Sequence, residues 1–150
     1  MKTQMKRRRI LPFLLAVCVT VGPGAFIENP NDYVYTVEDG KATITEYLGD
    51  GVKLIIPSKL DGVPVVAIGD GVFAGSDIEM IEIPDSVTEI GEGAFSNCQN
   101  LYSVNVPPSV KFIGEGAFAG CPHITVWTTE TGYVADYLKE NGISLRLWHT

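Results

Sequence analysis

One pattern occurs twice in the second half of the sequence, and this repetition constrains the fold more than any other feature. The stretch Ile83–Phe95 returns as Val106–Phe118, with each matched pair 23 residues apart, and the match continues through Cys98 and Cys121. A fixed period between about 20 and 50 residues is typical of stacked repeats, in which each unit buries its apolar side against its neighbours. The periodicity therefore predicts a solenoid.

A third and more divergent copy lies upstream. Val65–Phe73 precedes the matching residues by 22 positions, counted from Phe73 to Phe95, and Ser58–Pro64 lengthens the turn before it. Terminal repeats are expected to be atypical because one of their faces meets solvent. The divergence is therefore consistent with a repeat near the end of an array.

The order of elements within one unit follows from its residues. The apolar spacing over 78–83 and 101–106 predicts a short strand with one face inward, ended by a proline that cannot donate to a further ladder. The segments 87–91 and 110–114 end in a glycine, for which we predict a tight bend with positive φ. A large inward phenylalanine follows in each copy, on a predicted 3₁₀ or single helical turn.

The full pattern is Ile-Pro-x-Ser-Val-x-x-Ile-Gly-x-x-Ala-Phe-x-x-Cys-x-x-Leu-x-x-Val-x-Val, and over residues 56–126 it resembles three units of the BspA-type leucine-rich repeat. Members of this family are surface or secreted proteins of anaerobic, host-associated bacteria and some protists. The resemblance implies a β-rich leucine-rich-repeat solenoid of short parallel strands joined by turn or 3₁₀ segments. It implies a function only as a class, namely adhesion and protein–protein contact.

The segment before the repeats is predicted to close one end of the solenoid. Tyr33–Val37 and Ala42–Tyr47 alternate with period two around the turn signal Asp39-Gly40, which predicts a β-hairpin. This hairpin resembles the one that often opens such arrays. We assign residues 32–55 to an N-terminal hairpin cap.

The segment after the repeats, residues 127–150, is predicted to form a C-terminal cap of a helix followed by a strand. Thr131 can cap a helix that runs to about Asn141, and Gly142 ends it as a C′ glycine. Residues Ile143–Trp148 then alternate as a closing strand.

The N-terminus is typical of an export signal. A basic head, Lys6–Arg9, precedes the apolar run Ile10–Val21, which suits a signal peptide and falls short of the roughly 20 residues needed to span a bilayer. We predict a signal peptide over residues 1–25 and a single domain over residues 26–150, secreted or at the cell surface. An uncleaved signal or acylation of Cys18 is the alternative that would attach the protein to a membrane.

The charge of the predicted mature domain excludes two classes of partner. Five of the eleven basic residues and none of the eighteen acidic residues lie before Phe26, so six basic residues remain against eighteen acidic ones, a formal charge of −12. A domain this acidic does not attract nucleic acid or an anionic membrane surface. The sequence indicates neither a small-molecule substrate nor a cofactor.

Cys98 and Cys121 share one phase of the repeat, so stacked coils would bring them about 5 Å apart, the spacing of adjacent strands. Three interpretations are open: buried free thiols that pack as small apolar groups, a disulfide, and catalytic or metal-binding thiols. We favour the first, because ladder geometry need not suit the torsion of a disulfide. No second Cys/His pair accompanies His123, so a zinc site is not indicated.

Two further patterns contain residues that could bind a metal or take part in catalysis. Asp70, Glu92 and Glu115 each lie between two glycines, and a ladder of carboxylates could hold calcium, although a solvent-facing turn is the simpler interpretation. The two histidines, His123 and His149, are not placed near a nucleophile as a catalytic set requires. We therefore predict that the chain is not an enzyme.

The outward residues of the predicted strands form the candidate binding face: Glu79, Met80, Glu82, Tyr102, Ser103, Asn105 and Thr125. Solenoids tend to bind partners on an extended sheet surface, and Tyr and Met suit an interface. We therefore predict protein recognition or adhesion, with a protein or a host or cell-surface component as the partner. Two alternatives stay open. These residues are merely exposed on too few repeats to hold a partner, or the protein is a structural or envelope-associated one, lipid-anchored or free, without a specific ligand.

Overall fold

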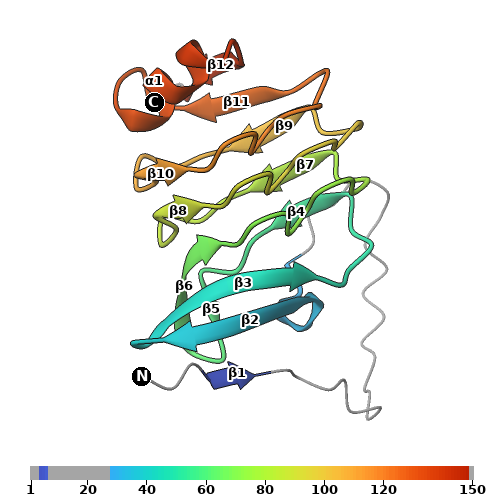
Figure 1. Cartoon of the computed structure of the whole chain (residues 1–150), viewed down its shortest axis with the longest axis vertical. Helices are drawn as coiled ribbons and strands as arrows, with labels where there is room; N and C mark the ends of the chain where they lie inside the picture. Colours follow the sequence, from blue (N-terminus) through green and yellow to red (C-terminus); the bar gives the residue numbers. More distant parts are fainter. Residues whose placement is uncertain (1–3, 7–27, 149–150) are drawn as a thin grey trace.

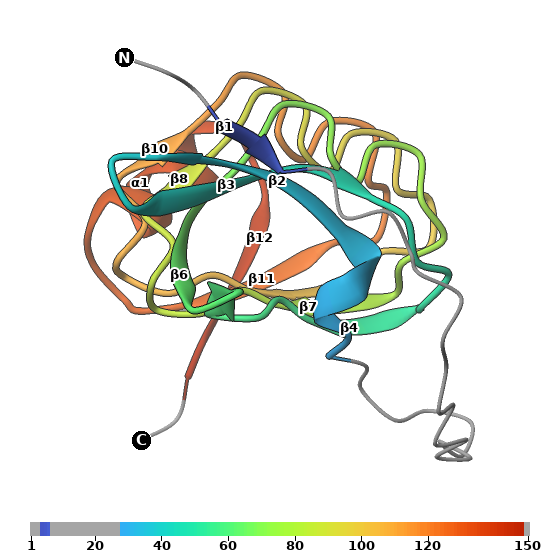
Figure 2. The same ribbon diagram turned by 90° about the horizontal axis from the view of Figure 1, so that it is seen from below.

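Short coils stack on one another along the long axis of the molecule, from a hairpin at one end to a helix at the other (Figure 1). The computed structural model describes residues 4–6 and 28–148. Seen along the stack, the coils superpose as rings of similar outline (Figure 2). The predicted β-rich solenoid is confirmed.

The structure contains twelve strands, one 3₁₀ turn and one α-helix within the described residues. The elements before the repeats are β1 (Gln4–Lys6), η1 (Pro30–Asp32), β2 (Tyr33–Glu38), β3 (Lys41–Tyr47), β4 (Lys53–Ile55) and β5 (Lys59–Leu60). The elements of the repeats and the C-terminal end are β6 (Val63–Ile68), β7 (Met80–Glu82), β8 (Glu89–Ile90), β9 (Ser103–Asn105), β10 (Phe112–Ile113), β11 (Thr125–Thr128), α1 (Tyr133–Glu140) and β12 (Ser144–Leu147).

The strands form two sheets on different sides of the stack (Figure 1). One sheet has the order β12-β11-β9-β7-β4, and its pairs are all parallel. The other follows the order β1-β2-β3-β6-β8-β10, with β5 paired to β6. The two-residue strands β8 and β10 pair in parallel where the sequence predicted only a bend. Each coil therefore contributes to two ladders rather than one.

A column of aromatic rings runs through the core from the hairpin to the last coil. The ring centroids are 5.3 Å apart for Tyr33–Tyr47, 5.3 Å for Tyr47–Phe73, 5.2 Å for Phe73–Phe95 and 5.4 Å for Phe95–Phe118. The last two pairs are stacked with nearly parallel planes. The predicted inward position of the phenylalanines is thus confirmed, and the hairpin continues the column with tyrosine.

The phenylalanines lie on two successive turns rather than on a helix. In the second repeat, Ala94 N donates to Gly91 O at 3.3 Å and Ser96 N donates to Gly93 O at 2.9 Å. The prediction of a positive φ at Gly91 is wrong, because the left-handed residue of this turn is Gly93, with φ +59°. Gly91 is required for another reason: a Cβ there would lie 2.6 Å from Asp70 N and from Gly69 C in the coil before.

The hairpin that closes the first end is formed as predicted. Strands β2 and β3 pair in antiparallel around Asp39 and Gly40, which have φ values of +49° and +72°. Two left-handed residues in succession are typical of a type I′ turn, which suits the twist of a two-residue hairpin. β3 then pairs in parallel with β6, which attaches the hairpin to the first coil.

The helix of the C-terminal cap is confirmed, but its predicted N-cap is wrong. The helix begins at Tyr133, and Gly132 occupies the N-cap position without a side-chain cap. Gly132 has φ +109°, a conformation that disfavours a side chain, so the backbone geometry at this reversal fixes the start of the helix rather than the hydroxyl of Thr131. At the other end Gly142 N bonds Lys139 O and Ile143 N bonds Leu138 O, which is a Schellman motif and confirms Gly142 as the C′ residue.

Most of the predicted signal peptide lies outside the described residues, as does Cys18. Of that segment the structure describes β1, which pairs in antiparallel with β2. In the described part of the chain no helix has the length and apolar character needed to cross a membrane.

Candidate binding face

The five-stranded parallel sheet presents one face to solvent. Its strands are in register, so the residues on either side of each central position align in two rows. The first row is Lys53, Met80, Ser103, Thr125 and Ser144. The second row is Ile55, Glu82, Asn105, Trp127 and Arg146.

On four of the five strands, the residue between the two rows is packed in the core, which anchors the face. Leu54, Ile81, Val104 and Val126 are each at most 1% exposed. Successive side chains of a strand point to opposite faces, so the flanking residues must point outward. Five strands at about 4.8 Å spacing give a face roughly 19 Å across, wider than three repeats alone would provide.

A shallow groove of about 300 Å³ lies across this face. Its lining residues are Met80, Ile81, Glu82, Ser103, Asn105, Trp127 and Trp148. The groove therefore combines two indole rings with an amide, a hydroxyl and a carboxylate. Large aromatic groups beside a few polar ones are enriched at protein interfaces.

Four of the residues predicted for the binding face, Met80, Glu82, Ser103 and Asn105, line this groove. Thr125 lies beyond them, in the first row on β11.

The remaining two predicted residues, Glu79 and Tyr102, precede β7 and β9 and lie outside the groove. Their backbones continue the ladder, with Tyr102 N donating to Glu79 O at 3.0 Å and Tyr102 O accepting from Thr125 N at 3.0 Å. The Tyr102 side chain is 43% exposed, so it remains available at the edge of the face.

Sequence reasoning missed the two tryptophans. Trp127 lies 22 residues after Asn105, so extending the strand alternation by one more unit would have found it. Trp148 follows the last strand, and the sequence alone could not place it beside β7 and β9. In the fold, its amide donates to Thr128 O at 3.3 Å. Lys53 and Ile55 were also missed, because they precede the recognisable repeats.

Cys98 and Cys121 are buried free thiols in the structure. Each donates to a carbonyl of the preceding coil, Cys98 Sγ to Phe73 O and Cys121 Sγ to Phe95 O, both at 3.0 Å. The neighbouring Cys98 sulfur and burial together raise the pKa of the Cys121 thiol above its ordinary value. A neutral thiol that donates to a carbonyl acts as a small core residue, which is the interpretation favoured above.

The acidic ladder of Asp70, Glu92 and Glu115 lies on an exposed turn. Asp70 Oδ1 accepts from Glu92 N at 2.8 Å, so this carboxylate holds the turn of the next coil. Within residues 4–6 and 28–148 no cluster of three His, Cys, Asp or Glu side chains is arranged to hold a metal ion.

The fold and its register define a leucine-rich-repeat solenoid, and comparison with known proteins specifies its type. Residues 66–137 match the family model described as "BspA type Leucine rich repeat region (6 copies)". A crystal structure of a leucine rich cell surface protein from Faecalibacterium prausnitzii A2-165 is similar with a TM-score of 0.61 and 36% identity, over 71% of this chain and 31% of that one. The T. pallidum leucine rich repeat protein gives a TM-score of 0.46 at 25% identity, over 67% and 70% of the two chains. No curated protein matches the chain significantly.

The repeats of this chain are therefore BspA-type leucine-rich repeats, as the sequence pattern predicted. The chain spans about a third of the length of the F. prausnitzii protein that it matches, 31%. Leucine-rich-repeat surface proteins as a class bind proteins or act in adhesion, and are typically not enzymes.

Proposed function

We propose that this chain is a secreted or cell-surface module that recognises a protein partner through its strand face. The observation that carries the proposal is the groove on that face, in which Trp127 and Trp148 accompany Glu82, Ser103 and Asn105. Rigid aromatic groups provide contact area at low conformational cost, and the polar groups fix the orientation of a partner. The similar F. prausnitzii protein is described as a cell surface protein, which supports the proposed location.

The charge of the module favours a partner that is not acidic. The predicted mature domain has a formal charge of −12, and Glu82 lies within the groove while Glu79 lies at the edge of the same face. Arg146 and Lys53 belong to the outer strands of the sheet, β12 and β4, so basic groups flank an acidic centre. A basic or neutral protein surface would complement this arrangement.

The proposal is tested by the binding of the purified chain to a panel of host matrix proteins and bacterial wall components. We expect saturable binding to a protein of the panel, weakened at least about tenfold by Trp127→Ala or Met80→Ala, since removal of a central contact costs over 1 kcal/mol. Phe112→Ala is the matched control, because Phe112 is a 55% exposed aromatic residue on the other sheet. Equal affinity for the strand-face variants and the wild type would remove the site. Absence of any saturable partner would favour a structural or envelope role.

A further inference from the structure

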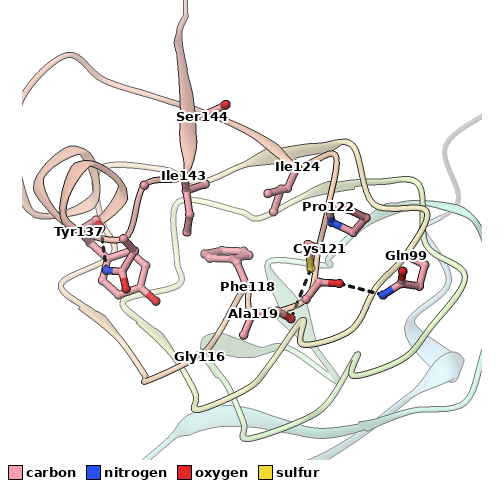
Figure 3. A pocket seen from close by; sticks show the side chains of 13 residues that line it. Gln99, Gly116, Phe118, Ala119, Cys121, Pro122, Ile124, Tyr137, Ile143 and Ser144 are labelled. Carbon is pink, nitrogen blue, oxygen red and sulfur yellow. Dashed lines mark hydrogen bonds between the residues drawn. The ribbon is translucent and has the colours of Figure 1, made fainter.

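Two hollows in the described surface differ in the chemistry of their walls. The larger, of about 680 Å³, lies between the last coil and the C-terminal cap, where Ile143 lies over the Phe118 ring and Tyr137 lies beside it (Figure 3). None of its lining residues is charged. The other is the groove of about 300 Å³ on the strand face, whose lining includes the carboxylate of Glu82. A charge beside aromatic rings gives the groove a definite preference among ligands, which the larger cavity lacks.

Glu82 is the one charged residue among the described residues that line the groove. It is half-buried on β7, and its carboxylate makes no hydrogen bond or ion pair with another residue that the structure describes. The basic residues of the same face, Lys53 and Arg146, belong to the outer strands and do not line the groove. A half-buried carboxylate gains more from a cationic partner than an exposed one does, because water screens the pair less.

Two indole rings complete the charged part of the groove. Trp127 is half-buried on β11, and Trp148 follows β12 and is 39% exposed. Within residues 4–6 and 28–148, neither indole is paired with another aromatic ring or with a cation, although Arg146 is the neighbour of Trp127 in the second row. The face of an indole attracts a cation more strongly than that of any other aromatic side chain. The rings and the carboxylate therefore favour the same kind of ligand.

The register brings these groups within reach of one ligand side chain. Glu82, Asn105 and Trp127 lie in one row on adjacent strands, so the row from Glu82 to Trp127 spans about 10 Å. A guanidinium group carries five N–H donors in one plane. Its edge can therefore donate to a carboxylate and an amide oxygen while its face lies on an indole. An ammonium group is a compact charge without such a face, so the groove suits arginine better than lysine.

We propose that the groove binds an arginine side chain of the partner protein, with the guanidinium between the carboxylate of Glu82 and the ring of Trp127. This inference rests on the proposed function and names the chemistry that the strand face selects. Charge favours a foreign basic segment over a second copy. Residues 28–148 contain six basic and eighteen acidic side chains, so two copies, each with a formal charge of −12, repel each other while a basic segment is attracted.

Tryptophan fluorescence tests the proposal, because the chain contains two tryptophans and both line the groove. The probe is the peptide acetyl-Ser-Arg-Ser-Arg-Ser-amide, titrated into the purified chain. A control peptide carries citrulline in place of both arginines, which keeps the shape of the side chain and removes its charge. We expect a saturable change of emission with the arginine peptide and at least about tenfold weaker binding of the citrulline peptide. A lysine peptide should bind with an affinity between the two.

Two charge variants separate the groove from the general charge of the surface. Glu82→Gln should weaken binding of the arginine peptide about tenfold, because it removes the half-buried anion. Glu92→Gln removes the same charge at an exposed turn outside the groove, and should leave the affinity within about twofold of the wild type. Circular dichroism confirms that both variants are folded.

Two ring variants test the contact with the indole. Trp127→Leu should weaken binding about fivefold or more, with Trp148 as the remaining fluorophore. Trp127→Phe keeps an aromatic face and should lose less. Equal losses in the two variants would show that the ring only fills space and does not attract the cation.

Other results would also contradict the arginine site. Equal affinity for the arginine and citrulline peptides, or no saturable change with either, would mean that the groove does not recognise the guanidinium charge. Equal losses in Glu82→Gln and Glu92→Gln would reduce the attraction to overall charge. An emission change that rises with protein concentration in the absence of peptide, and is abolished by Arg146→Gln, would assign the groove to a second copy. Saturable binding of neutral oligosaccharides in place of the arginine peptide would assign it to a carbohydrate.

The arginine site and the proposed function can fail separately. A panel protein whose binding is weakened by Trp127→Ala but not by Glu82→Gln would support the proposed function and remove the arginine site. Specific binding of the arginine peptide, without a saturable partner in the panel, would support the arginine site and count against the proposed function.

Discussion

At the scale of single residues, the two glycines of the Gly-x-Gly motif serve different purposes. Gly93 adopts a left-handed conformation with φ +59°, whereas Gly91 lies where its coil closely approaches the backbone of the preceding coil. A side chain at Gly91 meets the backbone of the preceding coil, and backbone atoms cannot move aside as a flexible side chain can. Replacement of Gly91 therefore forces the two coils apart at this point.

We predict that Gly91→Ala destabilises the protein by about 3 kcal/mol, the upper range for overpacking. Gly40→Ala serves as the comparison, since Gly40 has φ +72° but no atom within 4 Å of its Cβ position, and its left-handed strain alone costs about 1 kcal/mol. Urea unfolding followed by circular dichroism measures both changes. A loss for Gly91→Ala no larger than that for Gly40→Ala would contradict the close-approach argument.

At the scale of elements, α1 closes the exposed edge of one sheet with side chains rather than with a strand. Tyr133 accepts from the amide of Ile113 on β10, and Tyr137 donates to the carbonyl of Gly114. Two phenol groups on one helix thus take the place of a strand on the last coil. An edge covered in this way does not pair with other chains.

We expect Tyr133→Phe to lower the free energy of unfolding by about 1 kcal/mol, because it leaves the Ile113 amide without its acceptor. Tyr102→Phe, at an exposed tyrosine of the strand face, should change stability by less than about 0.5 kcal/mol. Faster hydrogen exchange at Ile113 in the first variant would locate the effect. Equal stability of the two variants would contradict the capping role.

Because of Tyr33 in the hairpin, we expect the free energy of unfolding to depend on pH in the alkaline range. Burial, with smaller contributions from Tyr47, Asp32 and Glu28, raises the pKa of Tyr33 far above its ordinary value of 10.0. The folded state therefore holds this proton more tightly than the unfolded chain does. The contribution of Tyr33 to the free energy of unfolding is complete below about pH 10. It is lost as the pH rises above that value, because the phenol then ionises in the unfolded chain before it ionises in the folded protein.

We predict that the loss of stability between pH 9 and about pH 11 is smaller in Tyr33→Phe than in the wild type, measured by urea unfolding at each pH. The residual slope should come in part from Tyr47 and Tyr137, whose pKa values are also raised by burial. An unchanged slope in the variant would show that Tyr33 does not titrate with unfolding.

At the scale of the whole molecule, the stack behaves as a one-dimensional array in which each coil touches only its neighbours. Phe95 stacks on a phenylalanine ring on both sides, whereas Phe118 stacks on one ring and on the cap. A change in the middle of the column therefore weakens two interfaces between coils.

We expect Phe95→Ala to cost about 4 to 5 kcal/mol, and Phe118→Ala to cost less, about 3 kcal/mol. Thermal unfolding monitored by calorimetry compares the two. A larger loss of stability for Phe118→Ala than for Phe95→Ala would contradict this prediction. It would mean that contact with the cap matters more than stacking within the column.

The sequence alone determined the architecture, because a 23-residue period with inward Phe95 and Phe118 is satisfied only by stacking equivalent units. It also determined the hairpin, since Asp39-Gly40 between alternating strands is a local signal. It indicated Met80, Glu82, Ser103 and Asn105 as outward residues, because strand alternation is a local property as well.

Only the tertiary structure decided the features that depend on contact between distant segments. The second ladder of β8 and β10, the close approach at Gly91 and the position of Trp148 on the binding face arise from pairing between coils, which no single segment encodes. The amides of Gly116, Phe118 and Gly120, which make no hydrogen bond within the described residues, belong to the same class, because the amides at the equivalent positions of the earlier coils are paired. The physical reason is that a repeat specifies its own shape locally, whereas what it touches depends on which neighbour is present.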